Sequence, residues 1–278
     1  MQVILDYINS FILGVIQGIT EWLPVSSTGH LIIWQELTGT LISDEFAEMF
    51  EVVVQFGSIL AVVVLFWNKL FPFSASKSKE ERGEVCNLWG KVIVAVAPAA
   101  VIGLLFDDII NDIFFNPYTV AATLIIYGVL FIVIENRNKN HTPKTQTLPA
   151  LTYKTALLIG TFQLLALIPG TSRSGTTILG AVILGCSRYV AAEFSFFMAV
   201  PVMLGASSLK LVKHGLDFVP HELAILAVGM ITAFVVSLFA LKFLVGYVRK
   251  HDFKPFGYYR IAMGIIIILY FVTKSFVA

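Results

Sequence analysis

Long apolar segments separated by short polar breaks constrain this chain more than any other feature. A helix needs about 20 apolar residues to cross a bilayer. Hydrophobic residues make up 57% of the 278 residues and charged residues only 13%, whereas a soluble domain carries roughly 25% charged residues. This composition excludes a disordered chain, a nucleic-acid binder and an ordinary soluble enzyme. We therefore expect an all-α polytopic membrane protein, one integral membrane domain over residues 1–278 with six transmembrane helices. The expected spans are Val52–Trp67, Val92–Phe106, Tyr118–Ile134, Val190–Leu209, Leu223–Val245 and Ile261–Val272.

Two further apolar stretches are interrupted in the middle. Val3–Thr38 contains the polar run Pro24–His30, and Thr155–Arg188 contains Pro169–Thr177. Each half has about 12–15 residues, which is short for a span, so both stretches are predicted to form re-entrant helix hairpins. Irregular backbone at membrane depth is stable only where protein buries it or where it lines a wet cavity. The two breaks are therefore expected to line one cavity.

The two interrupted stretches also resemble each other in spacing. This pattern predicts an internal duplication, with repeats at approximately 1–110 and 150–278. The matching positions are Gly14, Gln17 and Gly29 in the first stretch and Gly160, Gln163 and Gly175 in the second.

The distribution of charges predicts the topology. Lys and Arg accumulate in residues 68–91, in residues 136–154 and after the fifth apolar segment, which places these three loops in the cytoplasm. The connection Asp107–Pro117 carries Asp but no Lys or Arg and is expected outside, although Lys210 and Lys213 on the same side run against the pattern. With six spans, both termini lie outside and the two hairpins enter from opposite faces. The expected architecture is an inverted-topology repeat with polar tips near the midplane.

The first break carries ionisable groups where the membrane makes them costly. Gln17 and Glu21 are four residues apart and share one helix face, and Pro24 ends that helix. Gly29 is expected to supply an unusual backbone angle, and His30 opens the next half-helix, whose free N–H groups favour an anion. Ionisable residues at this depth usually have a functional role. The break also supplies hydroxyls from Ser26, Ser27 and Thr28.

The second break carries an arginine among hydroxyls. Arg173 presents a planar fork of donors that matches phosphate oxygens, and Gly170 and Gly175 let the backbone approach a ligand. The alternative is an arginine that extends to the cytoplasmic interface. Together the breaks hold a carboxylate, a histidine and hydroxyls, which suits phosphoryl transfer to a nucleophile with water as final acceptor. A lipid-borne phosphate is the expected substrate. The hydroxyls here belong to Ser172, Ser174, Thr176 and Thr177.

Two motifs resemble a known family. Residues 17–30, Gln-Gly-Ile-Thr-Glu-Trp-Leu-Pro-Val-Ser-Ser-Thr-Gly-His, and residues 169–175, Pro-Gly-Thr-Ser-Arg-Ser-Gly, look like the signatures of the undecaprenyl-diphosphatase family of bacitracin-resistance membrane phosphatases. Residues 50–61 and 192–206 also match, so the resemblance covers essentially the whole chain. It implies hydrolysis of undecaprenyl diphosphate to undecaprenyl phosphate and inorganic phosphate. That reaction recycles the carrier lipid for peptidoglycan and envelope polymer synthesis and confers bacitracin resistance.

The resemblance also implies a setting for the reaction. It implies a multi-pass protein of the bacterial plasma membrane, surrounded by membrane lipid, with the active site facing the outer leaflet. The partner is a polyprenyl diphosphate lipid, not nucleic acid, and the cofactor is a divalent cation, Mg²⁺ or Ca²⁺. The sequence does not distinguish a monomer from a homodimer.

The motif residues acquire roles through the same resemblance. Glu21 matches the acidic position proposed for metal or base duty, Arg173 matches the phosphate-clamping arginine, and Ser27 and His30 match the pair proposed for nucleophile and acid/base. Which of the two attacks phosphorus is left open. Many family members carry Glu where this chain has Gln17. Glutamine can bind a hard cation, here together with Glu21, but it cannot act as a base. The implied substrate-binding residues are Gln17, Ser26, Thr28, Ser172, Ser174 and Thr177.

Two other classes compete with the enzyme. Inverted repeats with broken helices are typical of secondary transporters, and an anion pocket could carry phosphate or flip a lipid. A membrane scaffold is the third class, but it does not account for ionisable groups at the midplane. Ser27 and His30 favour the enzyme because binding alone does not require reactive groups, and a chelator would test the expected cation.

Overall fold

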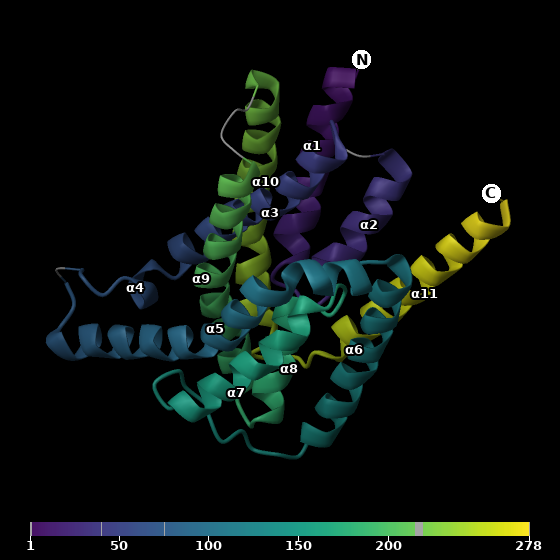
Figure 1. Ribbon diagram of the computed structural model, residues 1–278. Helices are drawn as coiled ribbons and strands as arrows, with labels where there is room; N and C mark the ends of the chain where they lie inside the picture. The colour runs from purple at the N-terminus through teal and green to yellow at the C-terminus, as the bar shows by residue number, and fades with distance from the viewer. Residues whose placement is uncertain (1, 40, 75, 215–218, 278) are drawn as a thin grey trace.

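The computed structural model describes residues 2–39, 41–74, 76–214 and 219–277, and the structure in these ranges is helical, as the sequence predicts (Figure 1). The elements in chain order are α1 (Gln2–Thr20), α2 (Ser27–Thr38), α3 (Asp44–Leu65), α4 (Trp67–Leu70), α5 (Lys79–Phe114), α6 (Pro117–Asn138), α7 (Tyr153–Gln163), the 3₁₀ helix η1 (Leu164–Leu167), α8 (Arg173–Ile183), α9 (Arg188–His214), α10 (Pro220–Tyr247) and α11 (Lys254–Val277).

Within the described residues, seven helices are long and apolar enough to cross a membrane, namely α1, α3, α5, α6, α9, α10 and α11. The sequence predicts six, and the additional helix is α1. The expectation that both halves of the first interrupted stretch are short is wrong for α1, whose 19 residues reach the length of a span. The helix runs unbroken through Asp6, Ser10 and Gln17, because these polar side chains are buried inside the protein. Ser10 Oγ donates to the Ile225 carbonyl of α10 at 2.6 Å.

Helices α2, α7 and α8 have 12, 11 and 11 residues and are too short to span a bilayer. In Figure 1, α1 and α2 occupy the upper part of the molecule, and α7 and α8 lie below them. The chain between α1 and α2 therefore meets the chain between α7 and α8 in the interior.

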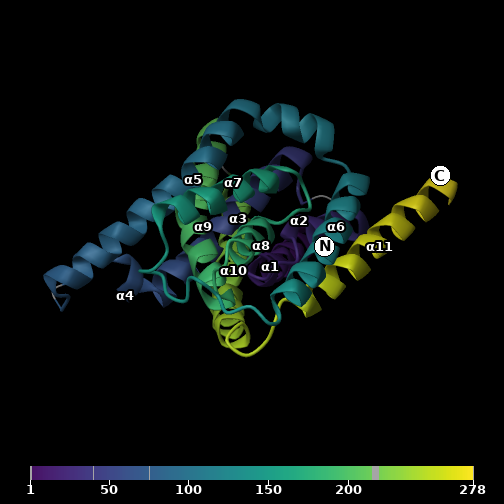
Figure 2. The ribbon, with the colours of Figure 1, turned by 90° about the horizontal axis from the view of Figure 1, so that it is seen from below.

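Helix α5 is longer than predicted. The expected connection Asp107–Pro117 is helical as far as Phe114, so only a short turn leads to α6. The start of α6 is well specified, because Asn116 Oδ1 accepts from the Thr119 N–H at 2.8 Å and Pro117 occupies the first helical position. Pro98 lies inside α5, which bends round one side of the molecule in Figure 2. For Asp107, Asp108 and Lys213, which the topology prediction used, the structure describes the helical backbone but not the charged side chains.

Glycines allow a close helix contact in each of the two interrupted stretches. Helix α1 packs on α10, and α7 packs on α5. A Cβ on Gly14 would lie 2.7 Å from the Gly229 carbonyl oxygen, and a Cβ on Gly160 would lie 2.0 Å from that of Ala95. Small residues permit such contacts between membrane helices. Gly14 and Gly160 are matching positions of the two stretches, so each hairpin contacts its neighbouring helix closely at the equivalent position of the repeat.

Helix α8 and the first half of α9 form the interior. Phe194, Phe196 and Phe197 are fully buried, and Figure 2 shows α8 near the centre with α5, α6 and α11 towards the outside. The outer helices instead expose large apolar side chains such as Leu104 and Phe239. Such a surface is unsuited to water and suited to lipid, and it leaves α8 to position polar groups inside.

Candidate active site

Both helix breaks end in a serine with left-handed backbone. Ser26 precedes α2 with φ 71° and Ser172 precedes α8 with φ 72°. Positive φ is uncommon for a residue other than glycine and often marks a functional site. The sequence assigned the unusual angle of the first break to Gly29, which is helical instead, because the turn occurs three residues earlier. In the second break Gly170 does adopt a positive φ of 87°.

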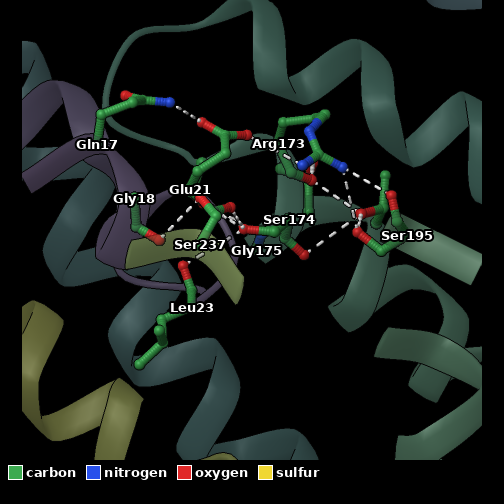
Figure 3. Close-up of polar contacts among 12 residues, drawn as sticks. Gln17, Gly18, Glu21, Leu23, Arg173, Ser174, Gly175, Ser195 and Ser237 are labelled. Carbon is green, nitrogen blue, oxygen red and sulfur yellow. Dashed lines mark hydrogen bonds and ion pairs between the residues drawn. The ribbon is translucent and has the colours of Figure 1, made fainter. Parts of the chain in front are cut away.

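An ion pair joins the two breaks (Figure 3). Arg173 Nη2 lies 3.0 Å from Glu21 Oε1, and the side chains are 12% and 8% exposed. Gln17 Nε2 donates to the other oxygen of Glu21 at 3.0 Å. The sequence predicted that these three residues converge, and they do so although Glu21 and Arg173 are far apart in the chain.

The other end of Arg173 contacts a residue that sequence reasoning missed. Arg173 Nη1 donates to the Ser195 carbonyl at 2.7 Å, and the Ser195 and Thr177 hydroxyls are 2.7 Å apart (Figure 3). Both hydroxyls are fully buried. A lone serine between phenylalanines in the apolar run 194–197 was the available signal. Arg173 is thus fixed at both ends and presents its fork in a defined orientation.

Two of the predicted substrate-binding residues, Ser174 and Thr177, form hydrogen bonds to backbone carbonyls of the two breaks. Ser174 Oγ donates to the Glu21 carbonyl at 3.0 Å, and Thr177 Oγ1 donates to the Arg173 carbonyl at 2.9 Å. Ser172 Oγ accepts from the Gly175 N–H at 3.2 Å and caps α8. Ser174 and Thr177 are buried away from the cavity described next, whereas Ser172 lines it.

A cavity of about 810 Å³ lies between the breaks. One end is polar and includes Glu21 and Arg173, and the remaining wall is largely apolar and comes mainly from α5 and α9. An apolar wall with a few convergent polar groups is typical of a ligand site. The other lining residues from the two breaks are Thr20, Ser26, Ser27, Thr28, Pro169, Gly170 and Ser172.

His30 lies beside this cavity and is not among the residues that line it. Its Nδ1 donates to the Ser26 carbonyl at 2.7 Å, and its ring stacks on that of Tyr259 with 5.5 Å between centroids. Because a carbonyl only accepts, Nδ1 carries a hydrogen, and Nε2 lies at hydrogen-bond distance, 2.6 Å, from the Tyr259 hydroxyl. The structure thus places Ser27, but not His30, on the cavity wall.

A second arginine, which does not line the cavity, forms hydrogen bonds to the backbone of both breaks. Arg260 is fully buried and donates to the carbonyls of Pro24, Gly170 and Thr171 at 3.0–3.1 Å. Sequence reasoning missed it, although a lone arginine at the head of the apolar run 261–272 was a signal. Its charge, that of Arg173 and the N-termini of α2 and α8 all favour an anion between the breaks.

The residues present fit a hard divalent cation only if a ligand completes its coordination. The described residues contain no group of three or more His, Cys, Asp or Glu side chains that could hold a metal ion. Gln17 Oε1, however, is buried with no hydrogen-bond partner among them, next to the Glu21 carboxylate. One carboxylate and one amide oxygen suit Mg²⁺ when phosphate oxygens and water supply the other ligands.

The fold and the site define a class, a polytopic helical membrane protein with a cavity between two helix breaks that is lined by charged and hydroxyl side chains. A family model described as bacitracin resistance protein BacA matches residues 10–266. A protein of Acetivibrio thermocellus named undecaprenyl-diphosphatase is 59% identical over 97% of this chain and 99% of its own length. Proteins of Enterococcus faecalis (undecaprenyl-diphosphatase) and Clostridioides difficile (undecaprenyl-diphosphatase 1) are 54% and 56% identical, over 95% and 96% of this chain and 97% of their own lengths.

The chain belongs to the bacitracin-resistance (BacA) family. The resemblance noted in the two motifs is confirmed over nearly its full length, and the chain is a multi-pass membrane protein of bacteria.

Proposed function

We propose that this chain is an undecaprenyl-diphosphate phosphatase that releases the terminal phosphate of its lipid substrate and so confers bacitracin resistance. The observation that carries the proposal is the Glu21–Arg173 pair, which joins both helix breaks at the polar end of a largely apolar cavity. A diphosphate head group suits the polar end, and an isoprenoid tail suits the apolar wall. The names of the relatives point to the same substrate.

The groove for the tail lies between α5 and α9. The lining residues of this wall include Leu104 and Leu105 of α5, which are exposed at the outer surface, and Leu209 and Val212 of α9. Exposed apolar residues in the wall let a lipid enter sideways from the bilayer. The sequence did not single out this groove because apolar residues line nearly every helix.

The same groove supports a site that faces the outer leaflet. The basic loop 136–154 is paired with the start of α9, since Lys144 N–H and Thr145 N–H both donate to the Gly185 carbonyl. The positive-inside rule places this loop in the cytoplasm, so α9 runs from the cytoplasmic to the outer side. Leu209 and Val212, near its far end, then lie in the outer half of the membrane. In this arrangement α1–α2 and α7–α8 are the matching parts of an inverted repeat, with α2, α7 and α8 too short to span.

Ser27 is the favoured nucleophile because it lines the cavity at the first residue of α2. Its Oγ attacks the terminal phosphorus, the bond from that phosphorus to the bridging oxygen breaks, and undecaprenyl phosphate leaves. Water then attacks the phosphoserine, which releases inorganic phosphate and restores Ser27. Arg173 and the helix N-termini stabilise the charge that develops on the equatorial oxygens.

His30 follows Ser27 by one helical turn and is the acid/base group of this proposal. It takes the serine proton or gives one to the leaving oxygen. The alternative, in which His30 Nε2 attacks phosphorus, stays open and predicts a phosphohistidine. In the structure this nitrogen forms a hydrogen bond with the Tyr259 hydroxyl, which favours Ser27 over His30 as the nucleophile.

A divalent cation completes the proposed site. Glu21 and Gln17 would hold it, together with oxygens of the diphosphate. When bound, it would neutralise charge on the phosphates. Besides Ser27, the hydroxyls of Ser26, Thr28 and Ser172 in the two breaks line the cavity and can donate to phosphate oxygens.

Phosphate release by the purified protein in detergent tests the proposal. Farnesyl or undecaprenyl diphosphate serves as substrate, with and without EDTA, for wild type, Ser27→Ala, Arg173→Ala and the exposed control Arg137→Ala. We expect release by wild type and by Arg137→Ala that stops with EDTA and falls at least ~100-fold in the other two variants. A folded wild type that binds the diphosphate lipid without releasing phosphate would instead indicate a transporter or flippase.

A further inference from the structure

Gln163 is the most poorly satisfied polar side chain on the cavity wall. It is 2% exposed, it lines the cavity, and neither its amide oxygen nor its amide nitrogen has a hydrogen-bond partner among the described residues. A buried amide without partners is costly, and native proteins keep one where a ligand or water satisfies it. No group in the described part of the chain explains why this position is a glutamine.

The position of Gln163 in the repeat adds an independent observation. Gln163 matches Gln17 in spacing, and Gln17 bonds the Glu21 carboxylate in the first break. The second break has no carboxylate at the position equivalent to Glu21, where Leu167 stands. Gln163 therefore has the same side-chain amide as Gln17, but it lacks a carboxylate partner like the one that Glu21 provides for Gln17.

Its neighbours show which part of a ligand it faces. Gln163 ends α7, and Ala166 and Leu167 of the following η1 line the apolar part of the cavity. Ser172 and Arg173, further along the chain, line the polar end. Gln163 thus belongs to the segment in which the lining changes from apolar to polar.

We propose that Gln163 is a substrate-binding residue whose amide N–H donates to the phosphate that stays on the lipid. This inference rests on the proposed function, in which Arg173 holds the terminal phosphate and the tail lies against α5 and α9. The proximal phosphate then lies between them, at the junction where Gln163 ends its helix. The terminal amide torsion of glutamine is soft, so a small rotation turns the N–H towards this phosphate.

The test replaces Gln163 by leucine, which has a similar size and no polar atoms. Thr161→Val on the exposed side of α7 is the matched control. For both variants and wild type, the measurements are KM and kcat with farnesyl diphosphate, inhibition by farnesyl monophosphate and by inorganic phosphate, and the melting temperature without ligand.

We expect KM and the inhibition constant of farnesyl monophosphate to rise about tenfold in Gln163→Leu, with kcat within about twofold of wild type, because the contact is the same in ground and transition states. Inhibition by inorganic phosphate should not change, since that ion occupies the terminal-phosphate position. The melting temperature without ligand should stay the same or rise, because leucine removes an unsatisfied amide. Thr161→Val should match wild type throughout.

Unchanged KM and monophosphate inhibition in Gln163→Leu would overturn the inference, as would a lower melting temperature with a matching fall in kcat, which indicates a structural role. If wild type releases no phosphate, the proposed function fails by itself. The rise in melting temperature that farnesyl diphosphate causes then tests the proposed Gln163 contact. A smaller rise in Gln163→Leu than in wild type would support the contact, and an equal rise would refute it.

Discussion

The two helix breaks share a backbone and differ in what their side chains do. Ser26 and Ser172 have nearly the same positive φ and precede α2 and α8. In the second break Ser172 caps its helix, and Arg173 and Ser174 bond to Ser195 and to the first break. In the first break the Ser26 hydroxyl has no partner among the described residues. The second break is a fixed clamp, whereas the first leaves the Ser26 hydroxyl without a partner in the described part of the chain.

This difference fits a division of labour in the proposed reaction. A phosphate clamp works best when its donors are held in place before the ligand arrives, and Arg173 is held at both ends. A nucleophile and substrate-binding hydroxyls must exchange partners during turnover. The following changes test the contrast, beginning with the largest expected effect.

Ser27→Ala removes the hydroxyl that begins α2. We expect turnover to fall by at least ~10³-fold, because the covalent step is lost, and the melting temperature to change little. Phosphate release and thermal denaturation in detergent measure the two effects. Turnover near the wild-type value would refute the serine nucleophile and favour a phosphohistidine at His30.

Arg173→Lys keeps the charge of the clamp and loses its fork. We expect about 100-fold slower turnover, since one ammonium cannot reach Glu21, Ser195 and a phosphate at once. Arg137→Lys, at an exposed position on α6, is the control for the same change. Full activity of Arg173→Lys would show that this arginine serves the structure and not phosphate binding.

Arg260→Met removes the support that the breaks share. The three backbone carbonyls then lose a charged donor, so we expect the free energy of unfolding to fall by about 2 kcal/mol. Unfolding by a denaturing detergent measures it, with Arg137→Met as control. An unchanged stability would mean that the breaks are held together by the Glu21–Arg173 pair alone.

The smallest change compares the two serines directly. Ser172→Ala loses a helix cap, which should cost about 1 kcal/mol of stability, whereas Ser26→Ala loses a hydroxyl without a partner and should cost close to nothing. Both alanines would adopt the same left-handed backbone, so the strain cancels in the comparison. Equal losses of melting temperature would contradict the distinction between a fixed and a free break.

The sequence predicts much of this fold because lipid imposes long apolar helices. All six expected spans are helical, and both breaks occur where Pro and hydroxyl residues interrupt the apolar pattern. Helix α1 was expected to be too short for a span, but it has 19 residues, and its polar side chains Asp6, Ser10 and Gln17 are buried in the protein. Periodicity alone does not show which polar residues a neighbouring helix will hide.

The site was predictable where chemistry is local and not where it depends on packing. Glu21, Ser27 and Arg173 stand in polar runs that no lipid-facing helix would carry. Ser195 and Arg260 join the site only through contacts across the fold, and the unsatisfied amide of Gln163 is visible only once its surroundings are known. The position of His30 beside the cavity depends on Tyr259 in the same way.

The central claim is that the two breaks form one phosphate site. The most direct measurement is a double-mutant cycle on phosphate release with Glu21→Gln, Arg173→Lys and the combined variant, all of which should retain measurable turnover. Residues that act together give a combined loss smaller than the product of the single losses, and this is the result we predict. A combined loss equal to that product would show that Glu21 and Arg173 act independently and would contradict the account.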